Sequence, residues 1–184
     1  MTIIQSLVGV SNTPKFVGYT MTSDRLAENI TFNFPDSIDG DLIIAYVVAE
    51  NMTVPILPNT WTTVYSNTAT AANCSSSGRL LAYKSKGINE SNTTVFVSGG
   101  GNITCVALRG TSKQFSNVTE WVANSSTTTY SSTNITPRQI WIAMFNQDGA
   151  VANALIGISN TNATYTRSNN DTRSTSIGYV QNTN

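Results

Sequence analysis

The stretch Ile30-Thr31-Phe32-Asn33-Phe34 indicates the fold class of this chain. Apolar side chains alternate with polar ones here, with the period of two that a strand shows when one face lies on a core. This pattern predicts that Ile30, Phe32 and Phe34 point into the core. Thr31 and Asn33 are then expected to face outward.

Similar short strands are expected along the rest of the chain. The turn-rich segment 35–41 predicts that the first strand pairs with the apolar run Leu42–Ala49. The glycines of Ser98-Gly99-Gly100-Gly101-Asn102 predict a hairpin between the strands on either side. The other expected strands are Lys15–Thr20, Trp61–Tyr65, Arg79–Lys84, Thr93–Ser98, Ile103–Leu108, Val118–Ala123, Gln139–Asn146, Ala154–Ser159, Ala163–Arg167 and Ser176–Gln181.

The composition supports the same fold class. Charged residues make up 11% of the chain, and polarity comes instead from 21 Asn, 27 Thr and 21 Ser. Thr favours strands, whereas Asn and Ser favour turns. The chain has 184 residues and 40% hydrophobic content, enough for one well-filled core. We therefore predict a single domain over 1–184, all-β, an antiparallel β-sandwich of jelly-roll-like type.

The charge pattern excludes some partners. Ten basic and ten acidic residues give a formal net charge of zero, so we expect no nucleic-acid partner, which would need clustered Lys and Arg. The run Leu42–Ala49 is too short to span a membrane. Residues 1–5 lack the basic start and long apolar core of a signal peptide.

The residue types needed for catalysis are sparse. The chain contains no His, the residue most often used as a general base and as a metal ligand. The carboxylates are scattered, and none of them forms an obvious glycosidase pair. Asp36, Asp39 and Asp41 crowd one loop, yet they lack the spacing of a calcium loop, which favours a solvated turn. We predict a non-enzyme with no catalytic residues, no cofactor and no metal site.

Two cysteines do not make a disulfide framework. Cys105 lies in a strand-like stretch and is expected to be a buried free thiol. A bridge to Cys74, which lies in a Ser-rich segment, is the alternative.

Three runs are apolar on both faces: Leu42–Ala49, Leu80–Tyr83 and Ile140–Phe145. A sandwich strand normally turns only one face to the core, so the other face needs a cover. That cover is either another segment of the same chain or a neighbouring subunit. The second alternative predicts a homo-oligomer or a docked protein, with Ile43, Val47 and Ile142 as interface residues.

The three tryptophans raise the question of sugar binding, because indole rings stack on sugars. Trp61 and Trp141 are expected in the core, where Trp usually anchors a sandwich. Trp121, flanked by Glu120 and Asn124, is the candidate for an exposed glycan platform.

A set of short motifs carries a resemblance to a known family. Their order resembles uncharacterised phage-encoded proteins with the pattern GDLLIA, P-x-G-W-T, L-x-x-Y-K and V-x-x-x-RG, although Thr60 replaces the usual Gly before Trp61. The motifs stand between Asn29 and Thr111, as 40–45, 58–62, 80–84 and 103–110.

This resemblance implies a jelly-roll-like sandwich associated with phage tails, fibres or head decorations, and it supplies no catalytic residues. We therefore expect a structural protein on the exterior of the virion, as a capsid decoration or knob. Its expected partners are other virion proteins and its own copies. The alternative is a tail-fibre or receptor-binding adhesin that recognises host surface glycans.

Overall fold

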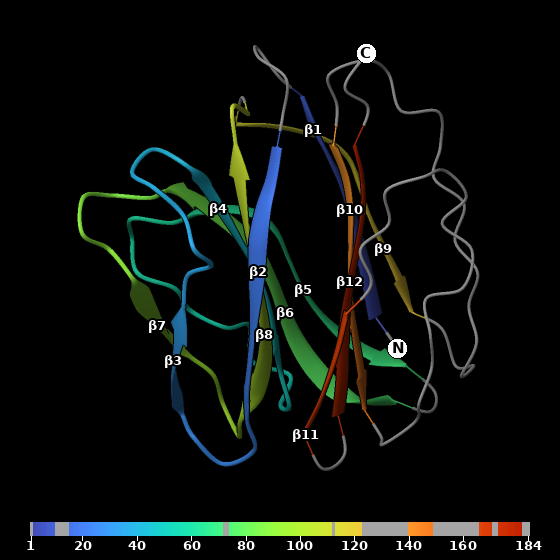
Figure 1. The fold of residues 1–184 in the computed structure, drawn as a ribbon. Coiled ribbons are helices and arrows are strands. Elements are labelled where there is room, and N and C mark those ends of the chain that lie inside the picture. Colours follow the sequence, from blue (N-terminus) through green and yellow to red (C-terminus); the bar gives the residue numbers. More distant parts are fainter. Residues whose placement is uncertain are drawn as a thin grey trace. The chain divides into compact units, whose positions relative to one another are not determined.

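A computed structural model describes residues 2–9, 15–71, 74–111, 113–122, 140–148, 166–170 and 173–181, drawn as a ribbon in Figure 1. Twelve strands and no helix occur in these ranges, and the eight strand pairings whose register is described are antiparallel. The predicted all-β fold class is therefore confirmed. No helix within these ranges is long and apolar enough to cross a membrane.

The chain forms two compact units, one of residues 17–109 and one of residues 1–16 and 110–184. The prediction of a single domain remains a prediction. The second of these units contains one five-stranded sheet in the order β11-β12-β10-β1-β9. Its strands are β1 (Thr2–Gly9), β9 (Gln114–Val122), β10 (Ile140–Asp148), β11 (Thr166–Asn170) and β12 (Arg173–Gln181).

Residues 17–109 form a two-layered sandwich. One layer is a five-stranded sheet in the order β2-β8-β4-β6-β5, and the other is the two-stranded sheet β3-β7 (Figure 1). The strands are β2 (Lys15–Asp24), β3 (Asn29–Asn33), β4 (Leu42–Ala49), β5 (Thr62–Ala71), β6 (Cys74–Ser85), β7 (Asn92–Phe96) and β8 (Gly101–Arg109). The predicted antiparallel sandwich is confirmed in this unit.

The alternating stretch behaves as its period predicts. Ile30, Phe32 and Phe34 are buried, whereas Thr31 and Asn33 are exposed. Phe32, Phe34 and Trp61 form an aromatic cluster with ring centroids 6.1 to 6.2 Å apart. The rest of the core comes from β4, β6, β7, β8 and the residue just after β7, namely Ile43, Ala45, Val47, Ala49, Leu80, Ala82, Val95, Val97, Ile103, Cys105 and Ala107.

Two predicted pairings are wrong. The partner of β3 is β7, in the register Ile30 to Val95, and the neighbours of β4 are β6 and β8. The segment 98–102 does not close a hairpin, because β7 belongs to the two-stranded sheet and β8 to the five-stranded one. Gly99 and Gly100 have φ of 75° and 90°, the left-handed conformation in which the chain passes from one sheet to the other.

Some of the predicted strands lie partly or wholly outside the described residues. Strand β1 was not predicted, and Ala154–Ser159 lies outside the described residues. The range predicted as Ala163–Arg167 meets β11 only at its last two residues, since residues 163–165 are not described. The remaining predicted strands overlap observed ones, and Leu42–Ala49 matches β4 at both ends.

The predicted interface residues do not lie on an open surface. Ile43 and Val47 are fully buried in the core cluster, which includes side chains of β3 and β7. On the opposite face of β4, Leu42, Ile44 and Tyr46 are also buried. Ile142 in β10 is fully buried as well. These side chains could reach another chain only if the fold opened, so their assignment as exposed interface residues is corrected.

Candidate interaction surface

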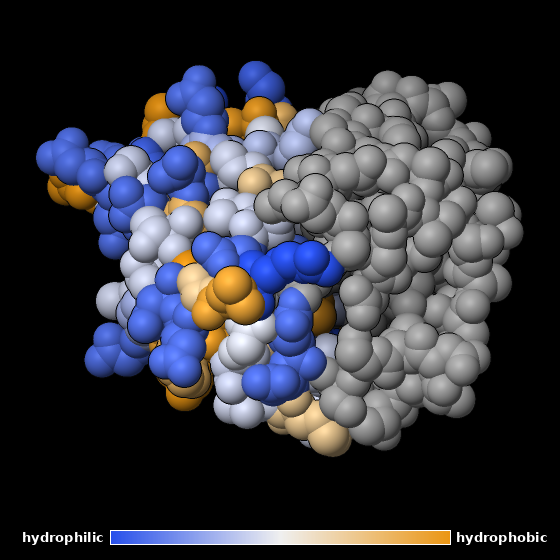
Figure 2. All heavy atoms as spheres, turned by 90° about the horizontal axis from the view of Figure 1, so that it is seen from below, coloured by the Kyte–Doolittle hydropathy of each residue, from blue (hydrophilic) through white to orange (hydrophobic). Residues whose placement is uncertain are grey.

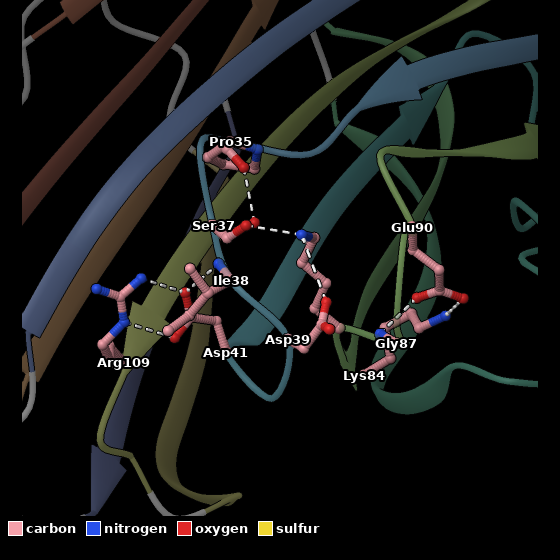
Figure 3. Close-up of polar contacts among 10 residues, drawn as sticks. Pro35, Ser37, Ile38, Asp39, Asp41, Lys84, Gly87, Glu90 and Arg109 are labelled. Carbon is pink, nitrogen blue, oxygen red and sulfur yellow. Dashed lines mark hydrogen bonds and ion pairs between the residues drawn. The ribbon is translucent and has the colours of Figure 1, made fainter.

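Three ion pairs, Lys84–Glu90, Lys86–Asp39 and Arg109–Asp41, gather at one end of the sandwich (Figure 3). We call it the loop end. It consists of the β3–β4 loop (34–41), the β6–β7 loop (86–91) and Arg109, the last residue of β8. It forms because Leu42, where β4 begins, is the register partner of both Ser85 of β6 and Leu108 of β8.

The centre of the loop end is an ion pair between Asp41 and Arg109. Arg109 donates from Nε to Oδ1 over 2.9 Å and from Nη2 to Oδ2 over 2.8 Å. The backbone N–H of Ile38 donates to the same Oδ2 over 2.9 Å. Asp41 is only 3% exposed, whereas 39% of the Arg109 side chain remains exposed. This two-pronged pairing is the geometry in which Arg binds carboxylate most strongly.

The pair shifts the titration of both groups. Burial by itself would raise the pKa of Asp41, but the hydrogen bonds from Arg109 and from the Ile38 N–H outweigh it and hold that pKa below its ordinary value. The hydrogen bond to Asp41 raises the pKa of Arg109. Asp41 therefore stays ionised, which suits a fixed structural anion and not a proton donor.

The two loops are also joined through their backbones. Gly40 donates its N–H to the Lys86 carbonyl over 2.9 Å, and Lys86 donates its N–H to the Asp41 carbonyl over 2.8 Å. Gly40 has φ of 86°, which allows the chain to turn directly into β4. Phe34 donates to the Ser91 carbonyl over 2.7 Å, so the loops are bonded at both ends.

Two lysines complete the network in Figure 3. Lys84 Nζ lies 2.6 Å from Glu90 Oε1, and Gly87 donates its N–H to Glu90 Oε2 over 2.8 Å. The hydrogen bond from Lys84 lowers the pKa of Glu90, and the one from Gly87 lowers it further. Lys86 Nζ donates to the Ser37 carbonyl over 2.6 Å and lies 4.0 Å from Asp39. Most charges of the loop end therefore already have partners within the chain.

The side chains that the loop end turns to solvent include two isoleucines. Ile38 on one loop is 58% exposed, and Ile88 on the other is 78% exposed. An exposed apolar side chain on a loop costs little by itself, and each of the two interbonded loops carries one. Figure 2 shows the described surface from below, where apolar patches are small and separated by hydrophilic residues.

The aspartate cluster predicted as a solvated turn is partly buried. Asp41 gives its oxygens to Arg109 and Ile38, and Asp39 is the weaker partner of Lys86. Within the described ranges, no group of three or more His, Cys, Asp or Glu could hold a metal ion. The residue missed from the sequence is Arg109, although it stands in one of the quoted motifs.

Other predicted residues fall elsewhere. Cys105 is a buried free thiol, as predicted, and burial raises its pKa in spite of a hydrogen bond with Thr20. Trp61 lies in the core, also as predicted. Trp121 lies in β9 opposite Ile3 of β1, and its side chain is outside what the structure describes. Its role as a glycan platform therefore remains a prediction.

Comparisons with known proteins add no relative. No protein-family model, no curated protein and no solved structure matches this chain.

Proposed function

We propose that this chain is a non-enzymatic structural protein of a bacteriophage particle, in the role of a surface decoration or knob on the capsid. The observation that carries the proposal is the loop end, where Ile38 and Ile88 are exposed on two loops. Backbone hydrogen bonds join these loops, and so does Lys86, which donates to the Ser37 carbonyl and lies 4.0 Å from Asp39. Rigid loops lose little conformational entropy on docking, so their apolar tips suit binding to a neighbouring virion protein or a second copy.

Composition and resemblance support the same role. A surface of Asn, Thr and Ser with few ions can be packed against a neighbour without removing water from many charges. The motifs that resemble phage-encoded proteins are accounted for by structure: Trp61 fills the core, Lys84 pairs with Glu90, and Arg109 pairs with Asp41. These contacts give each of the three residues a structural role.

The proposal is tested on purified particles of the phage that encodes the chain. Labelling with an antibody in electron microscopy is expected to place the protein on the capsid exterior. Label on the tail fibres would favour the adhesin alternative instead. Absence from purified particles would contradict both.

A variant pair tests the docking surface. Ile38→Lys with Ile88→Lys is expected to reduce incorporation into particles at least tenfold, because two charges would enter an apolar contact. Leu26→Lys is the matched control, because Leu26 is 88% exposed and lies away from the loop end. The backbone of its neighbour Arg25 lies against Gly100, which precedes the first residue of β8, whereas Arg109 of the loop end is the last residue of β8. Equal incorporation of both variants would show that the loop end is not the contact.

A further inference from the structure

The outer face of the β3–β7 sheet has an unusual set of side chains. Six outward positions are exposed and form three cross-strand pairs, Asn29 with Phe96, Thr31 with Thr94, and Asn33 with Asn92. We call these six residues, with Ile56, the ribbon face. The two strands lie side by side in Figure 1, and the opposite side of this sheet belongs to the core.

The polar part of this face consists of amides and hydroxyls. Asn occupies three of the six outward positions, at both ends of β3 and at the start of β7. The inward positions carry Ile30, Phe32, Thr93 and Val95. The hydroxyls of Thr31 and Thr94 lie 2.8 Å apart, which aligns them between the amides of Asn29 and Asn33.

An apolar spot adjoins the amides at one end. Ile56 and Phe96 exchange two backbone hydrogen bonds of 3.0 and 2.9 Å, which makes them directly opposite residues of an antiparallel bridge. Such partners point to the same side of a sheet. Ile56 is 61% exposed and Phe96 is 37% exposed, so both offer apolar surface beside Asn29.

We propose that the ribbon face binds a neutral glycan. Each Asn amide offers donors and an acceptor, and each Thr hydroxyl offers both, which matches the hydroxyl groups of a sugar. The ring of Phe96 and the side chain of Ile56 supply the apolar surface on which the C–H face of a sugar ring packs. Four residue steps along β3 make this face about 14 Å long, which suits a short oligosaccharide.

The charge of the face selects the class of ligand. None of its seven residues is ionic, so an acidic glycan or a nucleic acid would find no positive partner on it. A neutral glycan needs none. This inference goes beyond the structural role and does not depend on it, because the ribbon face and the loop end consist of different residues.

The test uses the full chain on an array of neutral and acidic oligosaccharides, followed by titration of the strongest neutral glycan. Asn29→Ala and Asn92→Ala are each expected to weaken binding about tenfold, and Phe96→Ala at least as much. Asn59→Ala is the matched control, because Asn59 is an exposed amide in the β4–β5 loop and outside this face. Thermal unfolding of each variant separates lost binding from lost fold, and the two Asn variants leave the bridge at Phe96 intact.

Several outcomes would overturn the proposal. The chain binds no neutral glycan on the array, it binds acidic glycans alone, or its binding is unchanged in the ribbon-face variants. Concentration-dependent self-association that Asn29→Ala and Asn92→Ala abolish would show that a second copy covers this face instead.

Discussion

Replacing Arg109 by Ala tests the ion pair of the loop end most directly. The carboxylate of Asp41 is 3% exposed in the native protein, and the change removes both of its hydrogen bonds from Arg109. The hydrogen bond from the Ile38 N–H remains. Removing one partner of a fully buried pair costs about 3 to 5 kcal/mol. Because 39% of the Arg109 side chain is exposed, water already weakens the pair, and we expect a cost of about 2 to 3 kcal/mol.

The reverse variant is expected to cost less. Asp41→Ala removes the buried anion itself, and the partly exposed guanidinium of Arg109 can turn to water. What remains is the Ile38 N–H without its acceptor, a loss of about 1 to 2 kcal/mol. In the double variant the two losses should not add, because each single variant already breaks the same pair.

The pH dependence of the same variants gives a second measurement. In the native protein the pKa of Asp41 lies below its unfolded value near 3.8, so its contribution is complete above that value and is lost as pH falls through the folded pKa. Without Arg109, its hydrogen bond and its charge no longer lower the pKa of Asp41, so that pKa is higher in the variant than in the native protein. The variant then gains stability relative to wild type as pH falls, because the buried carboxylate takes up a proton.

Urea denaturation from pH 7 down to pH 4 measures both effects. The difference in unfolding free energy between wild type and Arg109→Ala should be largest at pH 7 and should shrink towards pH 4. Lys15→Ala removes one exposed positive charge at the start of β2 and is the control. A cost below about 1 kcal/mol at pH 7, or a cost that does not change with pH, would show that the pair behaves as an exposed one.

Three further predictions concern the core and the backbone. Phe32→Ala should lower the unfolding free energy, measured in urea, by about 3 to 4 kcal/mol, because it leaves a cavity in the aromatic cluster. Phe32→Leu keeps more of the volume and should lower it by less than about 1.5 kcal/mol. Similar values for both would contradict the aromatic cluster. Gly78→Ala should lower the melting temperature more than Gly40→Ala, because the added Cβ would lie 1.8 Å from the Thr53 carbonyl oxygen. At Gly40 the added Cβ would meet no atom within 4 Å, so the strain comes from the positive φ alone; the reverse order would refute this. In a Cys74→Ser background, Cys105 should resist iodoacetamide at pH 8 in the folded protein and react in urea, because it is buried and its pKa is raised; modification of the folded protein would contradict its position.

The direction of side chains could be predicted from the sequence, because the strand period is local. Alternation from Ile30 to Phe34 identified which residues enter the core, and the apolar run gave both ends of β4. Strand partners depend on residues far along the chain and could not be predicted in the same way. Thr31 meets Thr94, 63 residues later, whereas the sequence favours the nearer apolar run as the partner.

Two errors have specific physical reasons. Three glycines in a row permit left-handed backbone, which serves a hairpin and a passage between sheets equally well, so segment 98–102 was ambiguous. The run Leu42–Ala49 is apolar on both faces, and sequence alone does not distinguish a strand buried on both sides from one that docks a neighbour. Because both faces of β4 are buried, a contact with another chain has to use other residues, such as Ile38 and Ile88.

The motifs that carry the phage resemblance gain a physical meaning from the loop end. Gly40-Asp41 and Arg109-Gly110 stand 68 residues apart, yet their charged members meet in one ion pair. Both glycines have positive φ, 86° and 68°, which lets the chain turn just before β4 and just after β8. Asp41 closes the first turn, Arg109 ends the strand beside it, and the pair joins neighbouring strands at the same end of the sheet. The pattern therefore describes how two central strands of the sheet start and stop together.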